Sequence, residues 1–172
     1  APEELHGRGT VGRVLKTLRY PDGSIRLLVQ GLQRIDVVQY TQRVPYFRAT
    51  VRAADEVATP GPELEALVAG VVTQFGKFVG LTPYLPDELQ MVAANITDPA
   101  KVADLIASNL NIAPEEKQAL LDRDDVRERL EELSRLLARE IELLELGNKI
   151  QSAVQSELSK NQKDFFLRPQ LK

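Results

Sequence analysis

The chain has 172 residues, of which 43% are hydrophobic and 27% charged, and this is the balance of a folded globular protein. Its formal net charge is −3, so the chain lacks the excess of positive charge that attracts a nucleic-acid backbone or an anionic membrane. We therefore discount both as partners. A chain of this length can bury one good core or two small ones, and we expect one or two domains.

The sequence contains no cysteine, which excludes disulfides, thiolate metal sites and a cysteine nucleophile, and fits a reducing compartment. No apolar run approaches the roughly 18 residues needed to span a bilayer. The opening stretch "APEELHGRGT" lacks the charged and then apolar pattern of a secretory signal. We therefore expect a cytoplasmic protein.

Residues 9–38 are predicted to form a β-hairpin. The stretch "YPDGS" between two β-rich runs places Pro21 where φ must be near −65°, and Gly23 where φ can turn positive. Gly31, inside the second run, indicates a bulge or bend in a long strand.

A third strand is predicted over residues 46–53, where apolar and polar side chains alternate as in a half-buried strand. Three strands alone make a thin sheet with unpaired edges. We therefore expect a small antiparallel β lobe over residues 1–58 that is either incomplete or covered by something else.

The pattern changes from strand to helix after a Pro-Gly-Pro stretch. Pro62 suits the first turn of a helix, because the N–H that proline lacks has no helical partner there. Apolar residues then recur at helical spacing, and Asp98 followed by Pro99 marks the start of another short helix. Residues 62–122 are predicted to form a lobe of short helices.

Residues 124–168 are predicted to form one long helix, because they contain no proline and their charges suit the helix dipole. At 1.5 Å per residue it would be about 65 Å long, too long to pack entirely on its own lobe. Two apolar stripes, rotated by roughly a third of a turn, change over near Gly147. The first stripe is Val126, Leu130, Leu133, Leu137, Ile141 and Leu144. The second stripe is Leu146, Ile150, Val154, Leu158 and Phe165.

We interpret the two stripes as two packing faces. The first half of the helix packs on the helical lobe, and the second half extends to a partner. The predicted partner or oligomer face consists of Ile150, Val154, Leu158 and Phe165. We expect residues 165–167 to be disordered or buried against a neighbouring molecule. The alternative is a helix that ends at Gly147 and turns back.

No residue pattern indicates a catalytic, cofactor or metal site. Gly70 and Gly76 are separated by five residues instead of the four of a phosphate-binding loop. His6 is the only histidine, so neither a histidine triad nor a histidine cluster can form. Ser156 and Lys160 have the spacing of a Ser-Lys pair, but on an exposed helix that spacing is typical of solvated surface.

Aromatic and apolar residues on irregular backbone are typical of recognition surfaces. The candidate contact surface consists of Tyr46 and Phe47 in "VPYF", and Leu81, Tyr84 and Leu85 in "LTPYLPDELQM". The alternative interpretation is that these side chains cover a small core.

The hairpin "LRYPDGSIRLLVQGLQRIDV", preceded by "GTVGRVLK" and followed by a helical lobe, resembles the N-terminal domain of Lon, the ATP-dependent serine protease. The last stretch, "LELGNKIQSAVQSELSKNQKDFFLRPQLK", looks like the long helix that leads from that domain towards the ATPase ring. The resemblance covers nearly the whole chain. The family domain normally opens with further strands and a helix, so the β lobe is expected to be incomplete, and Pro169 stands where the family helix continues.

The resemblance implies an α+β fold with a small β lobe, a helical lobe and one long helix. It also implies a non-catalytic part of a hexameric AAA+ protease, which recognises unfolded or damaged proteins in protein quality control and supports hexamer assembly through the long helix. The candidate contact surface would then touch substrate. ATP and magnesium are expected only in the ATPase module, and the Ser-Lys dyad only in the protease module, both absent from this chain.

Two alternatives stay open at this point. The chain could be a free-standing adaptor or ligand-binding protein with a Lon-type head. It could also be an element whose main role is coiled-coil association.

Overall fold

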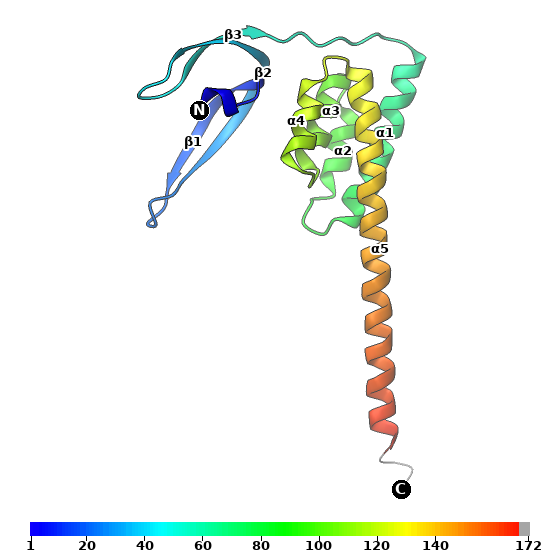
Figure 1. Cartoon of the computed structure of the whole chain (residues 1–172). Coiled ribbons are helices and arrows are strands. Elements are labelled where there is room, and N and C mark those ends of the chain that lie inside the picture. Colours follow the sequence, from blue (N-terminus) through cyan, green and yellow to red (C-terminus); the bar gives the residue numbers. More distant parts are fainter. Residues whose placement is uncertain (169–172) are drawn as a thin grey trace. The chain divides into compact units, whose positions relative to one another are not determined.

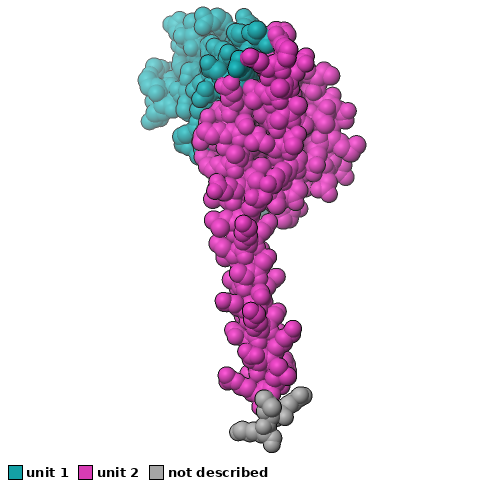
Figure 2. All heavy atoms as spheres, turned by 90° about the vertical axis from the view of Figure 1, so that its right-hand side faces the viewer, with its two compact units in different colours: residues 1–59, 111–129 teal, residues 60–110, 130–172 magenta. Residues whose placement is uncertain are grey.

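The computed structural model describes residues 1–168, and the chain divides into two compact units (Figure 2). Unit 1 contains Ala1–Thr59 and Asn111–Arg129, and unit 2 contains Pro60–Leu110 and the chain from Leu130 onward. Strands occur only in unit 1 among the residues described, while unit 2 is helical. The expected α+β class is therefore confirmed.

Unit 1 is built on an antiparallel sheet of three strands in the order β1-β2-β3 (Figure 1). The strands are β1 (Arg8–Arg19), β2 (Ile25–Gln42) and β3 (Arg48–Ala53), and the 3-10 turn η1 (Pro2–Glu4) precedes them. β1 and β3 are the two edges of this sheet. The predicted three strands are thus confirmed, and each edge strand pairs with β2 alone.

The β1–β2 connection is the tight turn that "YPDGS" predicts. The N–H of Gly23 donates to the carbonyl of Tyr20 at 3.0 Å, and the N–H of Tyr20 donates to the carbonyl of Ser24 at 2.9 Å. Gly23 has a φ of 83°, a conformation that glycine adopts without a steric penalty. The carboxylate of Asp22 accepts the N–H of Ser24 at 2.9 Å and so fixes the turn from its side chain.

Two irregularities interrupt the β1–β2 ladder, one after Val11 and one after Val14. The first lies beside Gly31, where the sequence predicts a bulge. A Cβ placed on Gly12 at this point would lie 2.6 Å from Cγ1 of Val29. Glycine is therefore required here unless the valine side chain moves.

The helix α4 (Pro114–Asp122) belongs to unit 1, in contrast with the expected helical lobe over residues 62–122. Polar contacts with the start of β1 give the reason. The side-chain amide of Gln118 donates to the carbonyl of Arg8 at 3.1 Å, and Nη1 of Arg8 donates to the carbonyl of Asp122 at 3.3 Å. Local sequence patterns carry no signal of these contacts, because the two partners are more than 100 residues apart.

Unit 2 consists of α1 (Pro62–Leu81), α2 (Glu88–Asn95), α3 (Pro99–Asn109) and most of α5 (Val126–Leu167). α3 begins where the sequence predicts, since the carboxylate of Asp98 accepts the N–H of Ala100 at 3.0 Å. The core of the unit is apolar and draws on all four helices. Its buried side chains include Leu64, Val71, Phe75, Phe78, Val79, Ala93, Val102, Ala103, Ile106, Leu130, Leu133, Leu136, Leu137 and Ile141.

α5 is one continuous helix of 42 residues, about 63 Å long at 1.5 Å per residue (Figure 1). It starts two residues later and ends one residue earlier than the expected helix over residues 124–168. The alternative of a helix that ends at Gly147 is wrong, because the helix passes through this residue without interruption. Pro169, the expected departure from the family helix, lies outside the described residues.

α1 is long and apolar enough to cross a membrane by length and composition alone. The expectation concerned an unbroken apolar run, and α1 is not one, because it contains Glu63, Glu65 and Lys77. The finding is weak support for a span, since the core helix of a globular protein passes the same test. In this protein, the buried side chains of α1 are Leu64, Val71, Phe75, Phe78 and Val79, which contribute to the core of unit 2.

Candidate interaction surfaces

The distal half of α5 presents an uncovered row of apolar side chains. The predicted partner face, Ile150, Val154, Leu158 and Phe165, is more than half exposed at every position. Leu146, which starts the same stripe, is exposed as well, whereas Ile141 is buried. The helix therefore changes from packed to uncovered within two turns, and the role of the exposed face stays a prediction.

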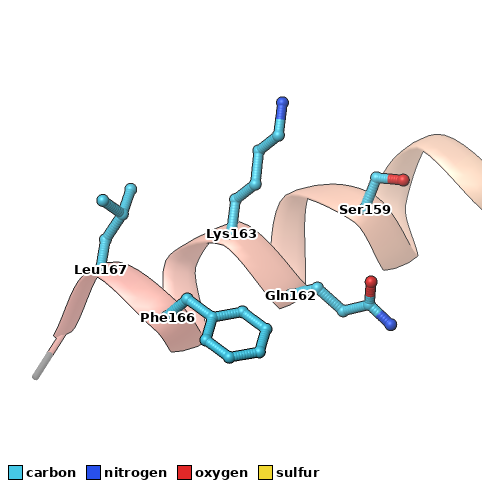
Figure 3. A pocket seen from close by; sticks show the side chains of 5 residues that line it. All are labelled: Ser159, Gln162, Lys163, Phe166 and Leu167. Atoms are coloured by element: carbon cyan, nitrogen blue, oxygen red, sulfur yellow. The ribbon is translucent and has the colours of Figure 1, made fainter.

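The last turns of α5 carry a shallow hollow lined by side chains of this helix (Figure 3). Lys163 and Leu167 extend along one side of the helix, and Gln162 and Phe166 lie on the adjacent side. The ring of Phe166 meets that of Phe165 edge-on, with centroids 6.1 Å apart. All of residues 165–167 are helical and exposed, so the expectation of disorder is wrong, and their burial against a neighbouring molecule stays a prediction.

A groove between α1 and α5 in unit 2 is crossed by polar contacts. The hydroxyl of Ser134 donates to Oε1 of Gln74 at 2.7 Å, and Nζ of Lys77 lies 2.7 Å from Oε1 of Glu145. The hydrogen bond from Lys77 lowers the pKa of the Glu145 carboxyl, and the charge of Lys77 adds to this effect. These pairs join the two helices, and we assign the groove no ligand.

Tyr46 and Phe47, two residues of the candidate contact surface, lie in the loop just before β3 and not at its start. The ring of Phe47 packs edge-on against Tyr40 of β2, with centroids 6.0 Å apart. The side-chain amide of Gln42 donates to the carbonyl of Tyr46 at 3.2 Å. Both aromatic side chains stay exposed, and this loop is the part of the candidate surface that unit 1 holds.

The other three residues of the candidate contact surface belong to unit 2. Leu81 is the last residue of α1, and Leu85 lies in the loop between α1 and α2. Both are half-buried, whereas Tyr84 in the same loop is 71% exposed. Between them Thr82 is buried, and its hydroxyl donates to the carbonyl of Phe78 at 2.8 Å. The residues of the candidate surface thus divide between the two units, and their contact with substrate stays a prediction.

Most of the exposed large apolar side chains of unit 1 lie on the β1–β2 hairpin, which the sequence pattern did not indicate as a contact surface. Successive side chains of a strand point to opposite faces, yet the consecutive Leu27 and Leu28 are 54% and 59% exposed. Both faces of the hairpin are therefore uncovered within residues 1–168. The other exposed apolar residues are Val11, Val14, Leu15, Leu18, Ile25, Val29 and Leu32. Alternating patterns indicate that a strand buries one face, but they do not reveal whether a covering layer exists.

An ion-pair network in unit 1 stabilises the end of the sheet at which β1 begins. Nε of Arg8 donates to Oδ1 of Asp36 at 2.8 Å, and Nη1 of Arg8 donates to Oδ1 of Asp124 at 2.5 Å. The hydrogen bond from Arg8 lowers the pKa of the Asp36 carboxyl, and the nearby Arg52 adds to the effect. The two pairs join β1 to β2 and to the segment before α5.

A second group of ion pairs holds the segment that follows β3. Nη1 of Arg129 donates to Oε2 of Glu56 at 2.9 Å, and Nη1 of Arg34 lies 3.1 Å from the same oxygen. Arg129 is only 1% exposed, although it is charged. Next to this pair, Val57 and Asp125 form a parallel β-bridge. These long-range contacts have no counterpart in the local sequence pattern.

The acidic residues before α5 act as structural groups. Within residues 1–168, no three His, Asp or Glu side chains are grouped so that they could hold a metal ion. Instead, Asp122 accepts the side-chain amide of Gln118 at 2.9 Å, and Asp125 accepts the N–H of Arg127 at 2.9 Å. The contact of Asp125 is that of a residue at the start of a helix, whereas Asp122 is the last residue of α4.

The sequence matches the family described as the ATP-dependent protease La (LON) substrate-binding domain, over residues 1–139. It is 43% identical over 171 residues to a Lon protease of Dictyoglomus thermophilum, and 40% identical over 171 residues to one of Syntrophus aciditrophicus. Each match covers 99% of this chain and 22% of the relative's length.

The fold is similar to that of the N-terminal domain of a Mycobacterium avium complex Lon protease. The TM-score is 0.67, and the match covers 77% of this chain and 70% of that chain. At 21% sequence identity, this similarity concerns the fold alone.

Proposed function

The chain belongs to the family of Lon substrate-binding domains, and from this premise we propose that it recognises unfolded or damaged proteins for an ATP-dependent protease in the cytoplasm and supports assembly of that protease into a hexamer. The chain spans about a fifth of the length of the curated relatives it matches, 22% for the first two. In this proposal, peptide-bond hydrolysis and the binding of ATP and magnesium belong to the remaining length.

The observation that carries the proposal is the uncovered hairpin of unit 1. Unfolded proteins expose apolar side chains together with unpaired backbone N–H and C=O groups, and folded proteins hide most of both. In this proposal an extended segment of the substrate pairs with one of the two strands that pair with β2 alone within residues 1–168. Exposed aliphatic side chains on both faces add apolar contact area. Such a surface favours unfolded over folded partners.

The two patches of the candidate contact surface support the same function. Tyr46 and Phe47 lie in the loop that leads into β3, and Tyr84 lies between α1 and α2. Exposed aromatic side chains contribute much of the binding energy at recognition surfaces. In this proposal they act as secondary contacts, because fewer exposed apolar side chains lie there than on the hairpin.

The proposal is tested by comparing one protein in two states of folding. The chain is titrated into a labelled protein whose disulfides are intact, and into the same protein after reduction and carboxymethylation, which keeps it unfolded. We expect saturable binding to the unfolded form and none to the folded form, measured by fluorescence anisotropy. Equal affinity for both forms, or binding to neither, contradicts the proposal.

A pair of variants locates the binding surface. Leu27→Ser with Leu28→Ser removes apolar side chains from both faces of the hairpin, and should weaken binding of the unfolded protein. Leu146→Ser with Ile150→Ser is the matched control, because it removes two equally exposed apolar side chains from α5. Far-UV circular dichroism checks that both variants fold. Equal losses in the two variants would mean that the hairpin is not the main surface.

The assembly role is supported by the uncovered face of α5. A helix that leaves four apolar side chains exposed on one stripe buries them when it packs against another helix. The neighbouring subunit is the partner that this part of the proposal names. Its test is given in the Discussion.

A further inference from the structure

One side chain of α1 makes two hydrogen bonds to a single residue of α5 within unit 2. The hydroxyl of Ser134 donates to Oε1 of Gln74 at 2.7 Å, and Nε2 of Gln74 donates to the backbone carbonyl of Ser134 at 3.3 Å. Both residues are half-buried. A hydrogen bond weakens when its angle departs far from linear, so two bonds to one residue restrict the direction as well as the distance of the contact.

The apolar contacts of α5 lack this directionality. Leu130, Leu133 and Leu137 are fully buried and follow one another at steps of three and four residues. Contacts between apolar side chains depend on area and shape, and a uniform row of leucines specifies one packing arrangement poorly. A slide of α5 by one turn, about 5.4 Å, would bring one leucine of the row into the place of the next.

The contact of Gln74 opposes such a slide. One turn before and one turn after Ser134, the residues on the same side of α5 are Leu130 and Ala138. The side chains of these two residues can neither donate nor accept a hydrogen bond, so the slide would leave the amide of Gln74 against an apolar side chain. A buried polar group without a partner costs free energy, and one polar contact in an apolar helix interface is a means of fixing register.

α1 provides a fixed surface for α5 to pack on. The rings of Phe75 and Phe78 are buried and stacked, with centroids 6.2 Å apart. On another side of α1, a Cβ placed on Gly76 would lie 3.3 Å from Oε1 of Gln90 on α2, which is tighter than an ordinary contact. α1 is therefore held closely by its own neighbours and cannot easily turn to follow a movement of α5.

We propose that Gln74 and Ser134 are positioning residues that fix the register and the rotation of α5 on α1. Because α5 is continuous from Val126 to Leu167, its rotation at Ser134 also determines the side of the helix axis on which its distal apolar stripe lies. A rotation by one residue position would turn that stripe by about 100°. The inference goes beyond the proposed function and does not depend on it, since the register belongs to unit 2 alone.

The other polar contact between the two helices is suited to be a control. Nζ of Lys77 lies 2.7 Å from Oε1 of Glu145, and the two side chains are 57% and 44% exposed. An exposed ion pair between long side chains contributes little to stability, and such side chains can follow a slide of the helix by changing rotamer. We therefore expect this pair to leave the register undetermined.

The chain contains no cysteine, so its register can be measured with two introduced spin labels. Ala66→Cys on α1 and Ser152→Cys on α5 place the labels at exposed positions away from Gln74 and Ser134. Double electron–electron resonance measures the distribution of distances between the labels, and an excess of unlabelled chain suppresses signals between different chains. We expect a single narrow distribution when the chain carries no further substitution.

Gln74→Leu together with Ser134→Ala should change this distribution. Both side-chain partners are removed at once, so no unpaired side-chain group stays buried, and we expect an unchanged or higher urea midpoint. The distance distribution should broaden or shift by about 5 Å, the rise of one helical turn. An unchanged distribution in this variant, whether or not its stability falls, would leave the pair a purely structural contact and overturns the inference.

Two further variants separate positioning from stability. Ser134→Thr keeps the hydroxyl and should keep the narrow distribution. Lys77→Met together with Glu145→Gln removes the exposed ion pair and should keep it as well. If this control broadens the distribution as much as the loss of Gln74 and Ser134 does, the register is not assigned to that pair. Should the double variant at 74 and 134 fail to fold, Ser134→Ala alone is measured in its place, and the same two outcomes decide.

Discussion

The guanidinium of Arg129 lies buried against the carboxylate of Glu56, with Nη1 of Arg129 2.9 Å from Oε2 of Glu56. Nη2 of Arg129 also donates to the carbonyl of Arg123 at 2.6 Å. Arg129 belongs to the first turn of α5 and Glu56 to the segment after β3, so the pair joins two parts of unit 1 that are 73 residues apart in sequence.

Replacing Glu56 by Gln should destabilise unit 1. The change removes the negative charge that balances two arginines, and leaves the cation of Arg129 buried without a counter-charge. We expect a loss of about 2–4 kcal/mol in the free energy of unfolding, somewhat less than a fully buried pair because Glu56 is partly exposed. Urea unfolding measures the loss, and hydrogen exchange of β2 and β3 locates it.

Glu132→Gln is the matched control, because Glu132 pairs with Arg135, whose side chain is 59% exposed, whereas that of Arg129 is 1% exposed. It should cost about 0–1 kcal/mol. A similar loss in the two variants would show that burial of Arg129 adds nothing to the pair.

Stability of the sheet should fall in acid through Asp36. Arg8 holds the pKa of this carboxyl below its usual range in the folded chain, so the ionised form stabilises the folded state. This contribution is complete above the unfolded pKa near 3.9, and is lost as the pH falls from there through the lower folded pKa. Hydrogen exchange of β1 and β2 at several pH values measures the loss.

Asp36→Asn removes the titrating group. The variant should be less stable than the unsubstituted chain at pH 7, and the difference should shrink as the pH falls below about 4. A difference that stays constant over this range would exclude Asp36 as a source of the pH dependence.

Truncation of leucines along α5 should show where packing ends. Leu137 is fully buried and Leu158 is 56% exposed. Leu137→Ala should cost about 2–5 kcal/mol in the free energy of unfolding, because it leaves a cavity in the core of unit 2. Leu158→Ala should change it by less than about 0.5 kcal/mol. The measurement is urea unfolding followed by circular dichroism, and comparable losses would contradict the exposed distal face.

A charge on the distal face of α5 should block self-association. Val154→Glu places a carboxylate in the middle of the predicted face without disturbing any buried side chain, because Val154 is 52% exposed. We expect the unsubstituted chain to associate with increasing concentration and the variant to stay monomeric, as measured by sedimentation velocity. Ser156→Glu adds the same charge on the opposite side of the helix and should have no effect. Unchanged association in both variants would exclude this face.

The sequence was sufficient to predict those features of the fold that depend on residues close together along the chain. The hairpin turn follows from Pro21 and Gly23, and the start of α3 from Asp98, because these residues act on backbone within a few positions. The length of α5 follows from the absence of proline and from its apolar stripes. The same signals predicted the exposed row that ends at Phe165.

Features that depend on distant partners were not predictable from local patterns. The contacts of Arg8 with Asp124 and of Arg129 with Glu56 join residues far apart in sequence. The same is true of the contacts of Arg8 with Gln118 and Asp122, which hold α4 to the sheet. The stretch from Arg8 to Ala53 has nine Lys or Arg and two Asp or Glu, but the net charge of −3 for the whole chain conceals this basic character. A charge count taken element by element would have found it.

The order of the units along the chain bears on how the protein is made. Unit 1 is interrupted after Thr59 and is completed only by Asn111–Arg129. During synthesis at roughly 5–20 residues per second, the 70 residues from Pro60 to Arg129 take about 4–14 s to add. For that time the nascent sheet exists without Asp124 and Arg129, the residues that later fasten it. The sheet is therefore synthesised before the residues that fasten it, and in this interval it depends on the pairing of its own strands.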